Sequence, residues 1–473
     1  MTGQIVCHIV EALYGDLPQE LKGETNSLST RRKGRGMEHN PQIYAARREA
    51  FVKQMGEGVA IFPAAPLSIR SNDTEYRYRQ DNDLYYLTGF PEPESVCLLS
   101  PQHEKERFIL FVRPRDKDKE VWTGRRFGPE RTKEVFGADA TYTIDKLDEI
   151  LPQHLATAEK VFYALGRDEQ MNAKILDLMN RSRMMRPRTG RGPVSLIDPG
   201  EILHELRLFK SEGELGLMQR AITASTAAHR AAMTQTRPGT YEYEIEAILE
   251  FHFRRLGATG PAYPSIVASG ANAAILHYTT NDRQMQNGDL LLIDAAAEYG
   301  CYCSDVTRTF PVGSQFSPLQ RDLYTLVLTA QKEAIAMMRP GVRFDDVHQR
   351  ATEILVDGLR DFGLLSGTTK EIIEKGEQRK FYMHRTSHWL GMDVHDVGKY
   401  KIGEESRVLE PGMVLTVEPG LYMAEDAEGV DERFRGIGIR IEDDVLVTAD
   451  GHEVLTKAIP KEIDEIEALR RGA

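Results

Sequence analysis

The sequence has few cysteines and no long apolar run. Four cysteines in 473 residues are too few for the disulfide scaffold of a small secreted protein. Cys301 and Cys303 stand two positions apart, so we expect them on the same side of a strand and not as a metal-binding C-x-x-C pair. No stretch approaches the roughly 18 apolar residues of a transmembrane helix, and the mean hydropathy is −0.42. We therefore expect a cytoplasmic protein in a reducing setting, without a membrane partner.

Positive charge is in the minority. The chain has 60 lysines and arginines against 72 acids, a formal charge of −12. General nucleic-acid binders usually carry a basic excess, so we expect no nucleic-acid partner. The remaining composition, 41% hydrophobic and 28% charged residues, is that of an ordinary globular protein. The length predicts two or three domains.

Residues 1–36 differ from the rest of the chain. They combine scattered acids with a basic cluster at residues 31–36, and they lack the basic and then apolar pattern of a secretory signal. The acids also argue against a mitochondrial presequence, which is normally poor in them. We expect a disordered extension, or translation assigned upstream of a true start at Met37.

Residues 37–209 have the pattern of an α/β domain. A helix is expected over Ala45–Met55, and strands separated by helical stretches predict a sheet covered by helices. A turn-rich, charged stretch at Arg181–Gly192 and a helical region starting near Ile202 precede the boundary, which we place at Lys210. The expected strands are Gly58–Phe62, Arg107–Val112 and Lys160–Tyr163, and the segments Leu84–Leu87 and Ser95–Leu99 flank a turn-rich stretch.

Residues 210–473 contain a faint internal repeat. Ala227–Gly239 and Ala330–Gly341 are helical stretches that both end in Arg-Pro-Gly, and helices are expected to follow at Tyr243–Arg255 and Asp345–Phe362. Pro and Gly end helices for steric reasons. Two such copies favour a pseudo-symmetric domain with helices on one face of a curved sheet.

Two aspartates lie next to an apolar strand in this second half. The run Leu290–Ile293 ends on Asp294, and Asp305 follows a turn expected at Glu298–Gly300, so the two acids are expected to lie across a hairpin. Acids at the inner ends of apolar strands are costly unless they are paired or bind a metal. Two interpretations stay open here. The pair binds a metal, or one aspartate caps a turn while the other pairs with Arg308.

Further acids and histidines favour the metal site. Glu418 directly follows a β-branched strand segment, and Glu442 follows another. The four carboxylates would balance two divalent cations, and His388 would complete a ligand set that favours Mn²⁺, Co²⁺ or Zn²⁺ over copper. Two such metals can share a bridging water and polarise a scissile carbonyl, which is a hydrolase arrangement. The part of the sequence that holds these acids, residues 275–444, also contains three more histidines, namely His277, His384 and His395.

At these residues the sequence resembles the pita-bread metallopeptidases, and among them the aminopeptidase P (Xaa-Pro aminopeptidase) branch. The matching segments are LLIDAAAEYGCYCSDVTRTFPV, HRTSHWLGMDVHDVG, LEPGMVLTVEPGLY and IGIRIEDDVLVT. In the first half, DTEYRYRQDNDLYYLTGFPEPES and WTGRRFGP are similar to the aminopeptidase P N-terminal domain. The resemblance implies an α/β (α+β) fold. A domain of the creatinase and aminopeptidase P type would span residues 37–209, and a pita-bread catalytic domain with pseudo-twofold symmetry would span residues 210–473.

The resemblance also implies a set of five metal ligands. Asp294 would bind one metal, Asp305 and Glu442 would bridge both, and His388 and Glu418 would complete the coordination. Glu418 would also act as general base for a metal-bridging hydroxide. Two divalent ions are implied, with Mn²⁺ as the family expectation and Zn²⁺ or Co²⁺ as alternatives.

Residues around the ligands receive implied roles as well. His277 and His395 would bind substrate and stabilise the tetrahedral intermediate. Substrate-binding or supporting positions would be His384, Arg440, Tyr422 and Trp122. The last of these would reach the active site of a neighbouring subunit, which assumes a homo-oligomer, either a dimer or a tetramer.

The implied activity is release of the N-terminal residue from peptides with proline in the second position. Proline-containing peptides would then be the partners. The alternative is a prolidase, an Xaa-Pro dipeptidase with the same five ligands. A less favoured alternative is a non-catalytic pita-bread binding protein, whose mark would be a lost ligand, and all five positions are present here.

Overall fold

The computed structural model describes residues 40–472. The expected extension at residues 1–36 lies outside the described residues. In the part that the structure describes, none of the helices has the length and apolar character that a membrane span requires.

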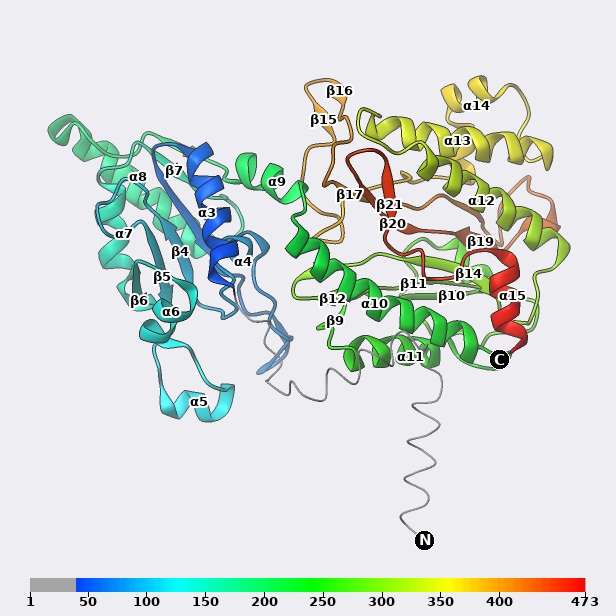
Figure 1. The fold of residues 1–473 in the computed structure, drawn as a ribbon, viewed down its shortest axis with the longest axis horizontal. Coiled ribbons are helices and arrows are strands. Elements are labelled where there is room, and N and C mark those ends of the chain that lie inside the picture. The colour runs from blue at the N-terminus through cyan, green and yellow to red at the C-terminus, as the bar shows by residue number, and fades with distance from the viewer. Residues whose placement is uncertain (1–39, 473) are drawn as a thin grey trace, which may run out of the picture. The chain divides into compact units, whose positions relative to one another are not determined.

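A mixed six-stranded sheet organises the first part of the chain (Figure 1), with the strand order β6-β5-β4-β1-β7-β8. The two central pairs, β1 with β4 and β4 with β5, are antiparallel, and the outer pairs are parallel. The expected strands are confirmed to within about two residues at their ends. The sheet strands are β1 (Val59–Pro63), β4 (Val96–Leu99), β5 (Phe108–Val112), β6 (Ala140–Thr143), β7 (Lys160–Phe162) and β8 (Ser195–Ile197), and β2 (Ile69–Ser71) and β3 (Thr74–Glu75) form a separate hairpin.

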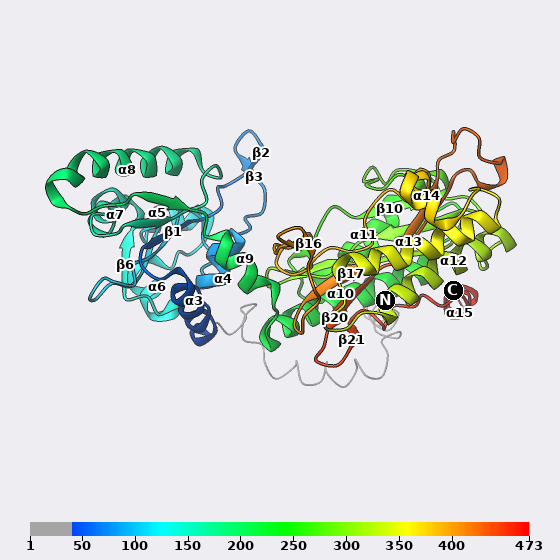
Figure 2. The same ribbon diagram turned by 90° about the horizontal axis from the view of Figure 1, so that it is seen from above.

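Helices cover both faces of this sheet (Figure 2). Along β1, Ile61 packs with residues of α7 and α8, whereas Ala60 and Phe62 pack with residues of α3, α4 and α6. This alternation follows from the two-residue period of a strand, and it confirms the predicted helix-covered sheet. The helices are α3 (Pro41–Met55), α4 (Asn82–Thr88), α5 (Lys117–Thr123), α6 (Gly128–Phe136), α7 (Leu147–Leu155), α8 (Glu169–Thr189) and α9 (Gly200–Leu208), with a 3-10 turn η1 (Ile144–Lys146).

Helix α8 corrects one expectation. The stretch Arg181–Gly192 was expected to be turn-rich, but α8 continues to Thr189 and includes Pro187 in its last turn. A proline near a helix end removes only one backbone hydrogen bond, and basic side chains are accommodated on an exposed helix face. The helix then ends at Gly190, whose φ of 69° is the left-handed conformation that favours glycine.

Two helix pairs confirm the internal repeat of the second part. The helices α10 (Glu212–Gln235) and α11 (Glu242–Arg255) flank one Arg-Pro-Gly, and α12 (Pro318–Ala336) and α13 (Phe344–Asp361) flank the other. Both terminal glycines have positive φ, 90° at Gly239 and 93° at Gly341, so both turns use the left-handed region that glycine adopts at little cost.

Short strand groups follow each helix pair. The sheets have the orders β10-β11-β14, β13-β12-β9, β17-β20-β21 and β18-β19. One apolar core joins all four of these helices to β10, β11, β14, β18 and β19. The strands are β9 (Gly260–Pro261), β10 (Ile266–Ser269), β11 (Leu290–Asp294), β12 (Ala297–Tyr299), β13 (Tyr302–Cys303), β14 (Thr307–Pro311), β15 (Lys401–Ile402), β16 (Glu405–Ser406), β17 (Val414–Val417), β18 (Gly420–Met423), β19 (Ile437–Arg440), β20 (Asp443–Val447) and β21 (His452–Val454). The remaining helical segments are η2 (Gly270–Ala274), α14 (Thr369–Lys375), η3 (Glu377–Lys380), η4 (Glu432–Phe434) and α15 (Ile463–Arg471).

The hairpin between β12 and β13 corrects the expectation for the cysteines. Tyr299 pairs with Tyr302, which leaves Gly300 and Cys301 as a two-residue turn with φ values of 59° and 67°. Two successive positive φ angles are typical of the tight hairpin turns that match strand twist. Cys301 therefore lies in the turn and not on the same strand side as Cys303, and both thiols are free.

Candidate active site

The two aspartates do lie together across the hairpin. The antiparallel register of β11 and β14 pairs Asp294 with Thr307, and the chain returns to β14 through Asp305. The Tyr263 hydroxyl contacts both acids, at 2.7 Å from Asp294 Oδ1 and 2.5 Å from Asp305 Oδ1. The alternative that one of them pairs with Arg308 is wrong, since this guanidinium is fully buried and pairs with Asp443.

A second antiparallel pair brings in the two glutamates. Val417 at the end of β17 pairs with Asp443 at the start of β20, so Glu418, which follows β17, lies beside Glu442, which precedes β20. Glu442 is buried and accepts a hydrogen bond of 2.7 Å from the Thr307 hydroxyl. Both glutamates are thereby positioned by strand register.

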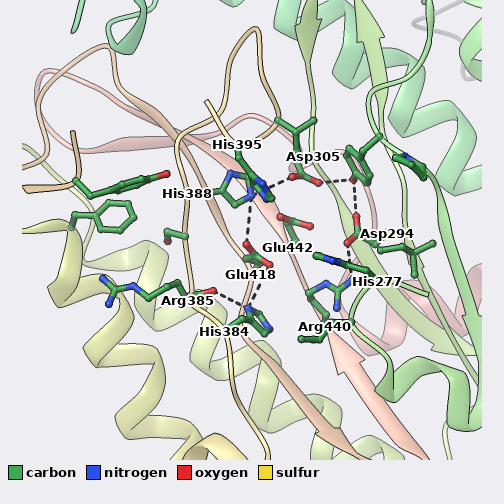
Figure 3. Close-up of a pocket in the computed structure, with 18 of the residues that line it drawn as sticks. His277, Asp294, Asp305, His384, Arg385, His388, His395, Glu418, Arg440 and Glu442 are labelled. Carbon is green, nitrogen blue, oxygen red and sulfur yellow. Dashed lines mark hydrogen bonds and ion pairs between the residues drawn. The ribbon is translucent and has the colours of Figure 1, made fainter. Parts of the chain in front are cut away.

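His388 completes the group from a neighbouring segment that runs along β17. The Thr416 amide donates to the His388 carbonyl, and the Glu418 amide donates to the Thr386 carbonyl. His388 Nε2 lies 3.4 Å from Asp305 Oδ2 and 3.5 Å from Glu418 Oε1. Its Nδ1 contacts the Trp389 carbonyl at 3.0 Å, which directs Nε2 toward the carboxylates (Figure 3).

The charges of this group are unbalanced. Burial and the neighbouring acids raise the pKa of the Glu442 carboxyl well above its ordinary value. Burial also raises the pKa of Glu418, against the opposing effects of His388 and Arg440. Burial would lower the pKa of His388, but its hydrogen bond to Asp305 and the charge of Glu418 raise it to about 9.

The donor set fits hard divalent cations. Ligand atoms of Asp305, His388 and Glu442 all lie within 4.8 Å of one another. Oxygen donors with one imidazole suit Mn²⁺, Co²⁺ or Zn²⁺. A divalent ion among these side chains would supply the positive charge that the cluster of acids needs, because like charges at this spacing disfavour joint ionisation.

Three predicted supporting residues form a connected chain beside the carboxylates. Arg440 donates to Asp294 Oδ2 at 2.7 Å and to the Tyr422 hydroxyl at 2.9 Å. The same hydroxyl lies 2.8 Å from His384 Nε2, and His384 Nδ1 lies 3.8 Å from Glu418 Oε2. Burial and the nearby Arg440 lower the pKa of His384 to about 4, so this imidazole is neutral at pH 7.

The remaining two predicted histidines line the same cavity, which has a volume of about 920 Å³ and is drawn in Figure 3. The ring of His395 lies 4.4 Å from that of His388, centroid to centroid. Burial and the His388 charge lower the pKa of His395. His277 lies exposed at the cavity wall. All predicted site residues therefore meet in this cavity or directly behind it, except Trp122.

Trp122 lies elsewhere. It is on α5, is 88% exposed, and is not among the residues that line the cavity. A role of Trp122 at a neighbouring subunit's site stays a prediction.

Two family models match this chain, one in its first part and one in the part that carries the site. The aminopeptidase P N-terminal domain matches residues 44–163, and metallopeptidase family M24 matches residues 216–449. The Xaa-Pro aminopeptidase of Escherichia coli is 43% identical over 434 residues, which are 91% of this chain and 98% of that protein. The chain belongs to metallopeptidase family M24.

Solved structures agree with this M24 assignment. The aminopeptidase PepP of Pseudomonas aeruginosa is 46% identical, with a TM-score of 0.89 that covers 92% of this chain and 99% of that one. A zinc-substituted aminopeptidase P of E. coli in complex with product is 43% identical, with a TM-score of 0.88 and coverage of 92% and 99%. The predicted fold class, an aminopeptidase P type N-terminal domain followed by an M24 domain, is confirmed.

Some residues of this M24 site carry no sequence signal. Tyr263 contacts two of the predicted ligands, and burial together with the neighbouring acids raises the pKa of its hydroxyl well above its ordinary value. Thr307 holds Glu442 and also accepts a hydrogen bond from Arg440 Nε at 3.1 Å. A lone tyrosine or threonine is common in any sequence, so only the folded arrangement reveals them.

A buried ion cluster supports the loop between His388 and His395. Asp396 is 5% exposed, pairs with Arg207 at 2.7 Å and with Lys210 at 2.9 Å, and its amide donates to the Trp389 carbonyl. Asp396 is not among the residues that line the cavity. Its contacts fix the loop on which both histidines stand.

Proposed function

We propose that this M24 metallopeptidase removes the N-terminal residue from peptides with proline in the second position, with Glu418 as general base. The observation that carries the proposal is that five ligand-type residues and three further histidines converge on one cavity. The extensive identity to a curated Xaa-Pro aminopeptidase supports the same activity. The retained ligands disfavour a non-catalytic binding protein.

Five residues would hold the metals, namely Asp294, Asp305, His388, Glu418 and Glu442. Two bound divalent ions would supply Lewis acidity and a water of lowered pKa. We propose Mn²⁺ as the metal in the cell, with Zn²⁺ or Co²⁺ as alternatives that the donor set also accepts.

The side chains of the chain itself would handle the proton and the substrate. Glu418, at the cavity wall, would accept a proton from the attacking water and pass it to the proline nitrogen as the peptide bond breaks. His395 and His277 face the cavity and, when neutral, each has one N–H to donate toward the developing negative charge. His384, held by Tyr422, stands beside Glu418 and would fix its orientation.

Proline selectivity has a physical basis in this cavity. An Xaa-Pro bond has no N–H on the proline nitrogen, and the ring fixes φ, so a site needs apolar surface for the ring and no acceptor for an amide. Apolar side chains line the cavity beside the ligands, among them Ile266, Leu276 and Val394.

The decisive experiment compares substrates of two lengths. The enzyme, stripped of metal and reloaded with Mn²⁺, Zn²⁺ or Co²⁺, is assayed on Arg-Pro-Pro and on Ala-Pro. We expect cleavage of the tripeptide before proline. Activity restricted to the dipeptide would make the enzyme a prolidase instead.

A matched variant tests the general base. Glu418→Gln keeps the size of the side chain and removes its ability to accept a proton, so we expect kcat to fall by on the order of 10²-fold or more while the protein stays folded. Full activity of this variant, in a preparation free of other peptidases, would refute the assigned role.

Domain limits, assembly and location are further proposals. We propose domains at residues 37–209 and 210–473, consistent with the two family matches.

We also propose that the protein assembles as a dimer or tetramer. Trp122 and the neighbouring Val121 are 88% and 81% exposed, which supports a contact between subunits at these residues. Light scattering of the wild type and of Trp122→Ala tests the assembly, and cell fractionation tests the proposed cytoplasmic location.

A further inference from the structure

We propose that Glu242, a buried carboxylate outside the cavity, is a positioning residue that holds the loop carrying His277. The inference rests on the proposed function, because it assigns Glu242 an effect on the peptidase reaction. Glu242 is the first residue of α11 and is fully buried. It does not line the cavity.

The carboxylate accepts five hydrogen bonds. Oε1 accepts from the Ser269 amide at 2.7 Å, from the Ser269 hydroxyl at 2.7 Å and from Asn272 Nδ2 at 3.2 Å. Oε2 accepts from the Tyr278 hydroxyl at 2.8 Å and from the Arg283 amide at 2.9 Å. A buried carboxylate is costly unless its lone pairs are satisfied, and here every donor belongs to the segment 269–283.

His277 lies inside that segment and depends on it. Among residues 40–472, no side chain or backbone group forms a hydrogen bond with the His277 imidazole. By contrast, His384 has partners on both ring nitrogens and His388 has one on Nδ1. The direction in which His277 points is therefore set by the backbone of its loop, and Tyr278, the next residue, is bonded to Glu242.

Other contacts fix the ends of the same loop. Asn281 is fully buried, accepts from the Val267 amide at 2.9 Å and donates to the Ser265 carbonyl at 2.9 Å, so it attaches the loop to β10 and the residue before it. At the other end, η2 packs so closely on β19 that a Cβ at Gly438 would collide with the Ala273 carbonyl. Glu242 bonds to residues on both sides of His277, and so it holds the stretch of chain between these two attachment points.

The acceptor-only character of a carboxylate is what the site requires. All five contacts are donated to Glu242, and the Arg283 and Ser269 amides cannot reverse their roles. In Glu242→Gln, one oxygen becomes an NH₂ group that faces donors. The loop must then move or lose bonds, and a displacement of about 1 Å at a substrate-contacting group costs on the order of 10²-fold in rate.

A double-mutant cycle tests the positioning role. We assay Glu242→Gln, His277→Ala and the double variant, metal-loaded, for kcat and KM on Arg-Pro-Pro. Glu242→Gln is expected to lower kcat by on the order of tenfold to 10²-fold in the wild-type background and by less than about twofold in the His277→Ala background, since coupled residues are not additive. Equal effects in both backgrounds would overturn the inference.

The matched control is Glu214→Gln. Glu214 is likewise buried in the first turn of a helix, accepts from the Ser211 amide and the Tyr302 hydroxyl, and lines no part of the cavity. We expect Glu214→Gln to change kcat by less than about twofold in both backgrounds, whatever its effect on melting temperature. An effect as large as that of Glu242→Gln, and equally dependent on His277, would overturn the inference.

If Glu242→Gln fails to fold, Tyr278→Phe removes one of the five hydrogen bonds to Glu242, and the same double-mutant cycle with His277→Ala decides. An inactive wild type would instead refute the proposed function.

Discussion

Removing Arg207 should destabilise the protein far more than removing an exposed arginine. Arg207 is 3% exposed and lies at the end of α9. Its guanidinium contacts Asp83 at 2.8 Å, Asp396 at 2.7 Å and Asp393 at 2.7 Å. Arg207→Met keeps most of the side-chain length but removes the cation shared by three carboxylates. Lys210 remains beside Asp396, and Asp83 keeps only the longer contacts of His204 at 3.7 Å and Arg167 at 3.9 Å. Removing one partner of a buried pair typically costs about 3–5 kcal/mol.

The assay is urea unfolding of the variant beside the wild type, with Arg350→Met as control. Arg350 pairs with Glu333 at 2.7 Å, but the two side chains are 43% and 50% exposed, so its loss should cost less than about 1 kcal/mol. We expect the unfolding midpoint of Arg207→Met to fall several times further than that of the control. Equal shifts, or a more stable Arg207→Met, would show that the cluster contributes no net stability and would refute the reasoning.

Three further outcomes are expected. Gly438→Ala should lower both the melting temperature and kcat, because its new methyl group collides with the Ala273 carbonyl; an unchanged melting curve would contradict this. Burial alone would raise the pKa of Asp83, but His204 and Arg207 lower it from 3.8 to about 2. The ionised Asp83 therefore contributes roughly 2 kcal/mol to the free energy of unfolding. This contribution is present above pH 4 and is lost as the pH falls toward 2, so Asp83→Asn should flatten the dependence of the unfolding free energy on pH between these values. Chelation of the metal should abolish turnover and lower the melting temperature. Mn²⁺ added at 100 times its dissociation constant should restore about 2.7 kcal/mol of folding stability. A melting temperature that does not change with metal would contradict the ligand assignment.

The fold, and the strand ends at which the candidate ligands stand, could be predicted because both depend on local pattern. Apolar runs that end on an acid specify where a strand stops and which residue stands at its end, as at Asp294 and Glu418. The resemblance to a family added which of the 72 acids belong together. Strand register, seen in the pairing of Val417 with Asp443, then brings the acids into contact.

The residues that could not be predicted act through contacts across the fold. Tyr263 and Glu242 have no local signature, since a tyrosine in a loop and a glutamate in a first helical turn are ordinary residues. The turn at Cys301 was misplaced because the pattern around it allows two adjacent turn positions, and pairing of the flanking strands decides between them. The same limit applied to the end of α8, where a solvated helix face and a charged loop have similar composition.

The buried acids of this chain are stabilised in different ways, and the difference bears on the proposed metal site. Asp443 and Asp396 are nearly or fully buried, and each contacts two cations, Arg308 with Lys461 and Arg207 with Lys210. Glu442 is equally buried, but within residues 40–472 its carboxylate forms no ion pair and accepts a hydrogen bond only from the Thr307 hydroxyl. Burying a charge without a partner costs several kcal/mol. Within the same residues Glu242 also forms no ion pair, but its carboxylate accepts five hydrogen bonds, whereas that of Glu442 accepts one, so a divalent cation would complete Glu442. The missing counter-charge at the cavity, more than the number of acids there, is the physical argument that supports the proposed metal site.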